Sequence, residues 1–339
     1  MCTALTYKTR DFYFGRTLDY DFSYGEEVVI TPRNFPFVFR HLPEEQTHYA
    51  MIGMAHVAEA GMSDDSSSGN SDSEYFPLYY DGANEKGLAM AGLNFPGNAV
   101  YGRVEKGKDN VAQFELIPWI LGKCGNIDEA VRLLEKINIT DTPFSELLPT
   151  TPLHWLIADG DRAVTVEATE EGLRIYDNEP GVLTNNPPFD KQLFALNNYM
   201  YLSPENPKNR FSDDISLKTY CQGMGAMGLP GDWSSQSRFV RAAFAKLNAV
   251  SGDSEEESVG QFFHIMDTVA QPRGCNDTGA EKFEISIYTS CCNVDKGIYY
   301  YTTYENRQIT AVKMKPELME GSALTRYALV QKQQIKAEN

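Results

Sequence analysis

The sequence predicts an α+β protein built from layered antiparallel sheets. Predicted strands and helices occur in runs, in the order strands, helices, strands, helices, strands. The regular alternation of single strands and helices that is typical of a doubly wound parallel sheet is missing. The chain has 339 residues, of which 42% are hydrophobic and 12% aromatic, so it can bury a large core. This length allows one large domain or two smaller ones, and of these we expect one domain over residues 2–339.

The chain is expected to begin with a β-hairpin. Apolar and polar side chains alternate over residues 3–7 and 12–18, on either side of a polar turn at 8–11. Three more strands are then expected, over residues 28–30, 50–57 and 86–95.

Two helices are predicted next, over 112–122 and 127–137, with Gly125 and Asn126 between them. The second has apolar residues at helical spacing. The remaining elements are strands over 153–157, 163–168 and 173–176, helices over 235–249 and 259–269, and strands over 284–289, 298–303 and 309–312.

Two segments interrupt this pattern. Residues 61–74 (GMSDDSSSGNSDSE) are rich in serine and acidic residues and almost free of apolar side chains, which predicts a mobile loop insertion. A solvated linker is the simplest interpretation of this stretch. Residues 189–216 are long, polar and rich in Asn and Pro, which indicates an excursion from the core.

The charge balance excludes some partners. A net charge of −17, from 30 basic and 47 acidic residues, argues against binding to nucleic acid or to an anionic membrane. No apolar run reaches the roughly 18 residues of a membrane span. The first residues lack the basic and apolar blocks of a signal peptide, so we expect a cytoplasmic protein.

The sequence gives no sign of a metal or a cofactor. The six cysteines include no C-x-x-C pair, and the five histidines have no metal-ligand spacing. The G-x-G-x-x-G match at 223–228 has no clear strand before it and no helix opening after it, so it does not predict a dinucleotide site. We expect neither a metal nor a cofactor.

Cys2, directly after the initiator Met, is the most informative residue of the chain. If Met1 is removed, one residue carries both a thiol and a free α-amine. An α-amine has an ordinary pKa of about 7.7–8, so it can accept the thiol proton without a histidine. Cysteine also occurs at the second position by chance. Whether Cys2 is catalytic must therefore be judged from the residues expected near it.

The returning strand of the first hairpin carries charged residues that suit such a thiol. The hairpin would bring Arg16 and Asp19 back toward Cys2. An arginine beside a thiol favours the thiolate, and a carboxylate can hold the α-amine. By charge count alone, a surface salt bridge explains the same two residues.

The motifs together resemble the choloylglycine hydrolase family, which contains bile salt hydrolases and penicillin V acylases. The resemblance runs from Cys2 to about residue 315, with the motifs in family order. It rests on M-C-T at the start, F-G-R-T-L-D-Y at 14–20, P-R-N at 32–34, N-E-K-G-L at 84–88, A-G-L-N-F at 91–95, G-V-L-T-N-N-P at 181–187 and G-L-P-G-D-W-S-S-Q-S-R-F at 228–239.

The resemblance implies an N-terminal-nucleophile (Ntn) hydrolase with a four-layer αββα fold. Cys2 matches the family's nucleophile, Arg16 the arginine beside it, and Asp19 the aspartate that holds the α-amine. Asn185 matches an oxyanion and substrate-positioning residue, and Arg238 matches a second arginine of the active site.

Asn94 stands where bile salt hydrolases have Asn and penicillin V acylases tend to have Tyr. Its side-chain or backbone N–H can donate to a developing oxyanion. Apart from the resemblance, Asn94 and Asn185 are equally typical of turns, and Arg238 of a solvated helix start.

The resemblance thus predicts hydrolysis of glycine- or taurine-conjugated bile acids through a thioester on Cys2. The alternatives are cleavage of penicillin V or another N-acyl amide, and a non-enzymatic protein with capped Cys2 that binds an amphipathic acid. Leu18, Phe22, Tyr24, Ile139 and Phe144 are candidates for an apolar substrate pocket, and each is also explained as an ordinary core or loop side chain.

The two unusual segments also acquire an interpretation from the family. The insertion at 61–74 departs from the family pattern, and we expect it to gate the pocket partly and to weaken binding of anionic conjugates. The segment 189–216 resembles an excursion used in subunit assembly, and the family commonly forms homotetramers.

Overall fold

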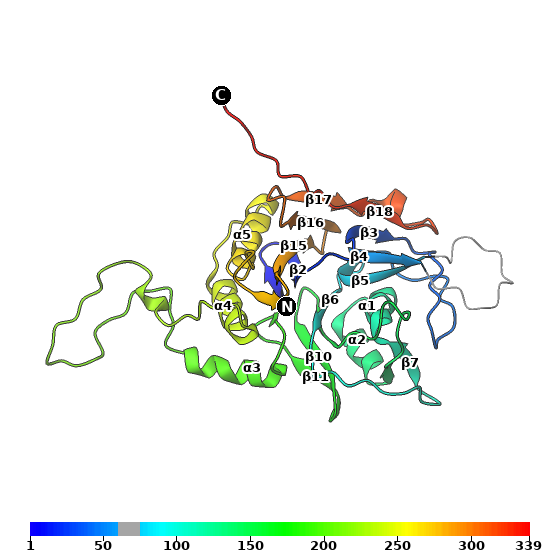
Figure 1. Cartoon of the computed structure of the whole chain (residues 1–339), viewed down its shortest axis with the longest axis horizontal. Helices are drawn as coiled ribbons and strands as arrows, with labels where there is room; N and C mark the ends of the chain where they lie inside the picture. The colour runs from blue at the N-terminus through cyan, green and yellow to red at the C-terminus, as the bar shows by residue number, and fades with distance from the viewer. Residues whose placement is uncertain (60–74) are drawn as a thin grey trace.

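Two antiparallel sheets lie face to face at the centre of the molecule, and helices cover their outer faces (Figure 1). The computed structural model describes residues 1–59 and 75–339. In this part of the chain the first sheet has six strands, in the order β12, β1, β2, β15, β16, β17. They are β1 (Cys2–Lys8), β2 (Phe12–Tyr20), β12 (Val182–Leu183), β15 (Ile285–Asn293), β16 (Ile298–Thr303) and β17 (Thr310–Lys313).

The second sheet has eight strands within the same described residues, in the order β11, β10, β9, β6, β5, β4, β3, β18. They are β3 (Glu27–Thr31), β4 (Met51–Glu59), β5 (Tyr75–Asn84), β6 (Ala89–Asn94), β9 (Leu153–Ala158), β10 (Ala163–Thr169), β11 (Gly172–Asp177) and β18 (Thr325–Ala328). Two small ladders pair β7 (Asp109–Ala112) with β8 (Ile137–Thr140) and β13 (Asp277–Gly279) with β14 (Lys282–Phe283).

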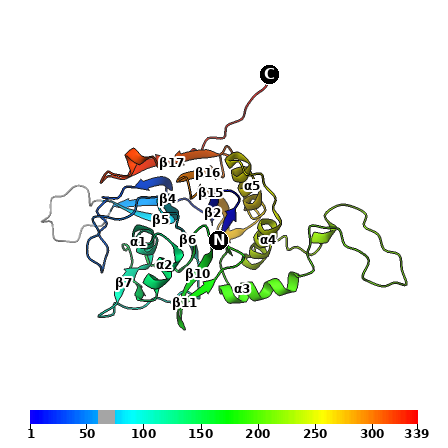
Figure 2. The same cartoon turned by 180° about the vertical axis from the view of Figure 1, so that it is seen from behind.

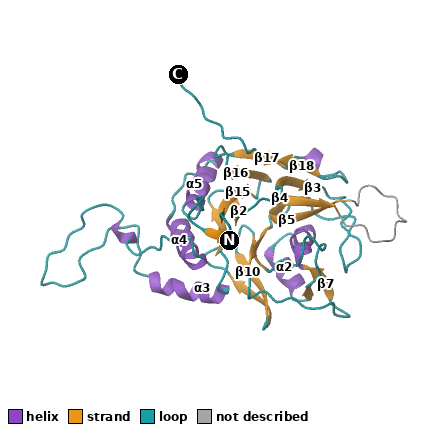
Figure 3. Ribbon diagram, in the orientation of Figure 1, coloured by secondary structure: helices purple, strands orange, loops and turns teal. Residues whose placement is uncertain are grey.

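The helices complete four layers (Figure 3). Helices α4 (Ser235–Asn248) and α5 (Glu255–Asp267) pack on the first sheet, against β1, β2 and β15. Helix α1 (Leu116–Lys123) packs on β5 and β6 of the second sheet, with α2 (Ile127–Leu134) beside it. The predicted αββα arrangement with antiparallel sheets is confirmed.

The core follows from this layering. One buried apolar cluster fills the space between the two sheets and under α4 and α5, and a second lies between the eight-stranded sheet and α1 and α2. Strands that face a sheet on one side and a helix on the other are buried on both faces. In β2, for example, every residue from Phe12 to Asp19 is buried.

The first hairpin is confirmed, and so is most of the predicted element order. Strand β5 was not predicted, because Pro77 and the Asp81-Gly82 pair are typical of strand ends. Helix α2 ends at Leu134, so Ile137 begins a strand instead of ending a helix.

Helix α5 starts earlier than its apolar pattern predicts. It starts at Glu255, because Ser254 and Glu257 form a capping box ahead of the apolar stripe. Residues 85–88 connect β5 to β6 in a turn, so the strand predicted over 86–95 begins at Ala89.

A long excursion leaves the sandwich after α3 (Phe189–Ala195) and η3 (Leu196–Tyr199). Figure 2 shows it from behind, extending away from the side of α3 and α4 before it returns through η4 (Met224–Ala226). The predicted excursion at 189–216 is thus helical at its start and continues beyond Ser216. The predicted insertion at 61–74 lies outside the described residues.

Gly15 allows β2 to lie against β15. A Cβ atom built on Gly15 would stand 2.0 Å from the carbonyl oxygen of Ser290 in β15. Any larger residue would push the two strands apart at the centre of the six-stranded sheet, one residue from Arg16.

A buried carboxylate fixes the loop that leads into α1. Glu115, in η2 (Gln113–Glu115), is fully buried and accepts the backbone N–H groups of Arg40 at 2.6 Å and Ala112 at 3.0 Å. Burial outweighs these hydrogen bonds and raises the pKa of Glu115 to about 7 from its ordinary value of 4.5.

This raised pKa gives the free energy of unfolding a pH dependence. The contribution of Glu115 is fully present below pH 4.5 and is lost as the pH rises through about 7. Replacing Glu115 by Gln should remove this loss, which is on the order of 3 kcal/mol for a shift of this size. Urea unfolding of both proteins between pH 5 and pH 8 measures it, and parallel pH curves would contradict the assignment.

Candidate active site

Cys2 lies at the end of a cavity of about 470 Å³. It is the first residue of β1 and is 4% exposed. The cavity walls are largely apolar and include Leu18, Tyr24, Leu78, Phe114, Phe144 and Leu148. Its size is within the usual range for a small-molecule site.

Arg16 comes to the Cys2 thiol from the neighbouring strand. In the β1–β2 ladder, Cys2 stands opposite Leu18 and Ala4 opposite Arg16. The Arg16 Nη2 donates to Cys2 Sγ, and Nη1 donates to the carbonyl oxygens of Tyr80 and Gly92. The guanidinium is 1% exposed, so these partners replace its water.

A buried carboxylate lies in the same region of the interior as Arg16. Asp81 accepts the hydroxyl groups of Tyr288 at 2.8 Å and Tyr299 at 2.6 Å. Burial lowers the pKa of Arg16, but the negative charges of a Cys2 thiolate and of the Asp81 and Asp19 carboxylates more than compensate, so the net shift of the pKa is upward. Arg16 therefore stays a cation although it is buried.

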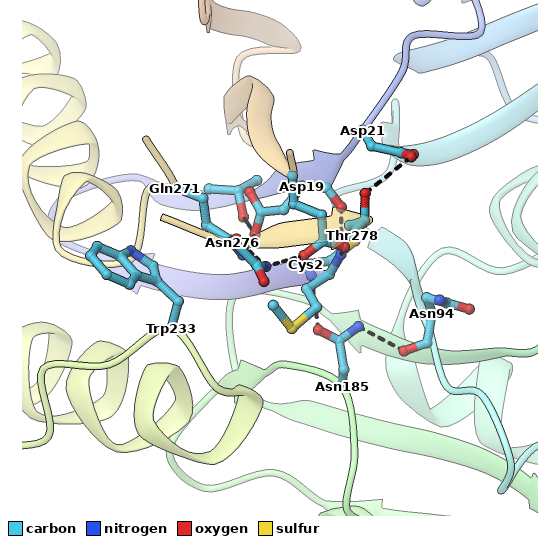
Figure 4. A network of polar contacts seen from close by, with 12 residues as sticks. Cys2, Asp19, Asp21, Asn94, Asn185, Trp233, Gln271, Asn276 and Thr278 are labelled. Carbon is cyan, nitrogen blue, oxygen red and sulfur yellow. Dashed lines mark hydrogen bonds and ion pairs between the residues drawn. The ribbon is translucent and has the colours of Figure 1, made fainter. Parts of the chain in front are cut away.

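Asp19 lies beside the backbone of Cys2 and holds several donors. Its carboxylate accepts Ser286 Oγ at 2.6 Å, Thr17 Oγ1 at 3.0 Å and Gln271 Nε2 at 3.2 Å (Figure 4). Its backbone N–H donates to the carbonyl oxygen of Met1 at 2.9 Å. Met1 is present here, so the peptide nitrogen of Cys2 stands in for the α-amine of the processed chain.

Asn185 connects Cys2 with Asn94. Its Oδ1 accepts the backbone N–H of Cys2 at 2.8 Å, and its Nδ2 donates to the carbonyl oxygen of Asn94 at 2.6 Å (Figure 4). The side chain of Asn94 lines the cavity. Ser235 Oγ accepts the backbone N–H of Asn185 at 2.8 Å, which ties this loop to the start of α4.

Arg238 contacts the backbone of Cys2 from helix α4. It is fully buried in α4, where Nη1 donates to the carbonyl oxygen of Cys2 at 2.5 Å and to Thr3 Oγ1 at 2.7 Å. Its Nη2 donates to Asn185 Oδ1 at 2.8 Å. Burial is the main cause that lowers the pKa of Arg238, against the opposing charge of Asp19.

The structure thus brings all six predicted catalytic residues together, in a group of Cys2, Arg16, Asp19, Asn94, Asn185 and Arg238. Of the predicted pocket residues, Leu18, Tyr24 and Phe144 line the cavity. Phe22 and Ile139 are not among the described residues that line it. Phe22 contacts the rings of Tyr20 and Tyr24 in tilted arrangements, and Ile139 is buried in β8.

This arrangement can support attack by a thiolate on a carbonyl carbon. A buried cation contacts the sulfur, the nitrogen of the same residue donates to Asn185 Oδ1, and Asn185 Nδ2 donates to the Asn94 carbonyl oxygen beside the cavity. Within the described residues no group of His, Cys, Asp and Glu side chains could hold a metal ion. The residues that are present suit covalent acyl chemistry.

Comparison with known proteins decides the family. The model for linear amide C–N hydrolases of the choloylglycine hydrolase family matches residues 2–327. A bile salt hydrolase/transferase of Lactiplantibacillus plantarum is 49% identical over 339 residues, which is 100% of both chains.

This chain belongs to the choloylglycine hydrolase family. A bile salt hydrolase/transferase of Clostridium perfringens is 39% identical over 332 residues, covering 96% of each chain. The crystal structure of a mutant conjugated bile acid hydrolase from Clostridium perfringens superimposes with a TM-score of 0.87 at 37% identity, over 100% of both chains. A penicillin V acylase from Agrobacterium tumefaciens has a TM-score of 0.73 at 20% identity, over 97% of this chain and 92% of its own, and shares the fold.

Sequence reasoning missed a buried pair behind Asn185 in this family member. His154 and Glu167 are both fully buried, and Nδ1 of the histidine lies 2.9 Å from Glu167 Oε1. The other ring nitrogen donates to the carbonyl oxygen of Thr184 at 2.8 Å. Glu167 Oε1 also accepts the backbone N–H of Phe189 at 3.0 Å, so the pair holds both ends of the segment that carries Asn185.

A signal for this pair exists in the sequence. In the β9–β10 hairpin, Ala158 pairs with Ala163 and Trp155 with Val166. One step further along the same register, His154 stands opposite Glu167. Both residues lie in predicted strands, so the hairpin register would have revealed a buried acid–base pair.

We expect His154→Gln to lower kcat for amide hydrolysis on the order of 10²-fold with little change in KM, because Asn185 would shift while the apolar pocket stays intact. Steady-state kinetics on the folded variant measures the two constants. His264→Gln, on the exposed side of α5, is the matched control and should behave as wild type. An equal rise in KM at unchanged kcat would contradict this role.

Proposed function

We propose that this chain hydrolyses the amide bond of glycine- or taurine-conjugated bile acids through a thioester on Cys2. The observation that carries the proposal is the position of Cys2, which starts β1 with its sulfur against Arg16 at one end of an apolar cavity. The names of the relatives from Lactiplantibacillus plantarum and Clostridium perfringens supply the substrate class.

The enzyme becomes able to react once Met1 has been removed. The freed α-amine of Cys2 takes the thiol proton, and the thiolate, stabilised by Arg16, attacks the amide carbonyl carbon. Donors from Asn185 and Asn94 stabilise the oxyanion, and removing one such donor typically costs about 2.7–4 kcal/mol of transition-state stabilisation. The protonated amine then gives its proton to the departing amino group.

The second half-reaction reuses the same groups. The α-amine activates a water molecule, which cleaves the thioester and releases the bile acid. In this proposal Asp19 orients the α-amine. Arg238 fixes Asn185 and the Cys2 carbonyl, a role supported by its one hydrogen bond to each of them.

The apolar cavity suits a steroid. Leu18, Tyr24 and Phe144 supply apolar wall, and Cys2, Arg16 and Asn94 line the same cavity. Phe22 supports Tyr24 through a tilted ring contact at a centroid distance of 4.6 Å, and Ile139 belongs to the buried cluster that contains Phe144. A long apolar acyl group would therefore lie along the wall with its amide at Cys2.

Other acyl amides are the alternative substrates. Penicillin V is a candidate because a penicillin V acylase shares the fold. Asn94 favours bile acids as the substrates within the family. A protein with capped Cys2 that only binds an amphipathic acid is the non-enzymatic alternative, and it fits poorly with a buried arginine at the thiol.

The proposal also covers the location and the assembly of the protein. No helix among the described residues is long and apolar enough to cross a membrane. We propose a cytoplasmic, single-domain protein that assembles as a homotetramer through the excursion. Large apolar side chains of that region are exposed, including Phe194, Met200, Tyr201, Phe211, Leu217 and Tyr220.

The function is tested by release of amino acid from glycocholate, taurocholate and penicillin V, with wild type and Cys2→Ala side by side. We expect release from the bile salts that depends on Cys2 and little from penicillin V. A form that keeps Met1 should be inactive, since its base is tied up in a peptide bond. Faster cleavage of penicillin V would overturn the substrate, and equal activity of Cys2→Ala would overturn the mechanism.

The assembly is tested by light scattering after gel filtration. Wild type should have four times the 38.0 kDa mass of one chain, and Phe211→Asp with Tyr220→Asp should give a smaller species. Leu247→Asp with Val250→Asp changes two exposed apolar residues near the end of α4 and serves as the control. A wild-type mass of one chain would refute the tetramer.

A further inference from the structure

The α-ammonium group of Met1 occupies a defined binding position beside Cys2. It forms an ion pair with Glu284 Oε1 at 2.6 Å and donates to the carbonyl oxygen of Asp19. The carbonyl oxygen of Met1 accepts the N–H of Asp19 at 2.9 Å, so Met1 extends the β1–β2 ladder by one residue. The chain itself therefore shows how this position binds an ammonium group.

The acceptor groups of this position are held in place. The Glu284 side chain is 12% exposed, and Asn276 Nδ2 donates to its Oε2. Asn276 also donates to Gln271 Oε1 at 2.9 Å, and Gln271 Nε2 donates to the Asp19 carboxylate at 3.2 Å (Figure 4). This chain of side chains links Glu284 to Asp19, so the carboxylate is fixed whether or not Met1 is present.

The position has the right distance for proton exchange with the catalytic amine. The Met1 nitrogen is separated from the Cys2 nitrogen by only two backbone atoms, which places the two nitrogens roughly 3.5 Å apart in an extended residue with standard bond lengths. An amine bound there after Met1 is removed would lie within hydrogen-bond reach of the Cys2 α-amine.

We propose that the position of the Met1 ammonium becomes the amine subsite of the mature enzyme, with Glu284 and the Asp19 carbonyl as its acceptors. It holds the primary amine that leaves during acylation, and it holds an amine that attacks the acyl group in the reverse direction. The inference rests on the proposed thioester chemistry and adds a residue, Glu284, that the hydrolytic mechanism does not use.

The step in the attacking direction is a simple exchange of bonds. The bound ammonium group first gives one proton to solvent, and the neutral amine nitrogen bonds to the carbonyl carbon of the Cys2 thioester as the C–S bond breaks. The second proton lost by this nitrogen passes to the Cys2 α-amine and from there to the departing thiolate. The products are an amide and the free thiol, with no oxidant or reductant required. The two bile salt hydrolase/transferases described above carry names that agree with transfer to an acceptor other than water.

The test separates this subsite from amide hydrolysis. Mature enzyme, with loss of Met1 verified by intact mass, is acylated with a 4-nitrophenyl ester of a bile acid, so that no amine is needed for acylation. Taurine or glycinamide is then supplied, and the ratio of amide to free acid is measured by mass spectrometry. Glu284→Gln should lower this ratio about tenfold, because a charge-assisted hydrogen bond to the amine is lost.

Asp21→Asn is the matched control. It removes one carboxylate close by, which accepts Thr278 Oγ1 at 3.4 Å and does not contact Met1 (Figure 4). Its ratio should stay within about twofold of wild type, since a rim charge is screened by solvent. Gln keeps the size of Glu284, and the melting temperature of each variant checks its fold.

The outcomes are distinct. An unchanged ratio in Glu284→Gln, an equal fall in Asp21→Asn, or a wild type that forms only free acid would each overturn the amine subsite. A wild type that accepts the ester and forms amide but releases nothing from glycocholate would overturn the proposed substrate and leave the subsite standing.

Discussion

The contact between a buried arginine and a buried thiol is the constraint on which the rest of the structure depends. Arg16 reaches Cys2 from the adjacent strand and donates through Nε to the carbonyl oxygen of Thr17, but its Nη1 is satisfied by carbonyl oxygens of Tyr80 and Gly92 in the other sheet. The two sheets must therefore be stacked in one particular offset before the guanidinium can be buried. Stacking of the core and assembly of the site are consequently the same event.

Burying that cation requires compensation further inside the molecule. Asp81 supplies negative charge in the interior, and its own burial raises its pKa in spite of nearby Arg16 and two tyrosine hydroxyls. Arg238 is buried on the opposite side of Cys2 and relies on neutral oxygens and on the charge of Asp19. A single unpaired ion in such an interior would cost several kcal/mol, so these groups are interdependent.

Local pattern predicted the parts of the site that lie near one another in the chain. The hairpin that joins Cys2 to Arg16 and Asp19 follows from alternation and a short polar turn, and the layered fold follows from the order of the runs. Asn185 and Arg238 come from distant segments, so only the resemblance to a family could bring them to Cys2. The His154–Glu167 pair could have been predicted from the register of its hairpin. The link from Gln271 through Asn276 to Glu284 depends on loop conformations, which sequence periodicity does not predict.

A nucleophile at the start of a strand must meet two requirements that oppose each other. Its backbone must be fixed well enough to aim the sulfur, yet its nitrogen must be free to exchange protons. The structure meets the first through the carbonyl oxygen of Cys2, which Arg238 holds, and through the ladder with β2. It meets the second through Asn185 Oδ1, which accepts the Cys2 N–H in a hydrogen bond, while the Asp19 carbonyl oxygen and Glu284 accept from the neighbouring Met1 nitrogen. Met1 occupies these last two acceptors, so the residue that blocks the Cys2 amine also marks the position proposed for an external amine.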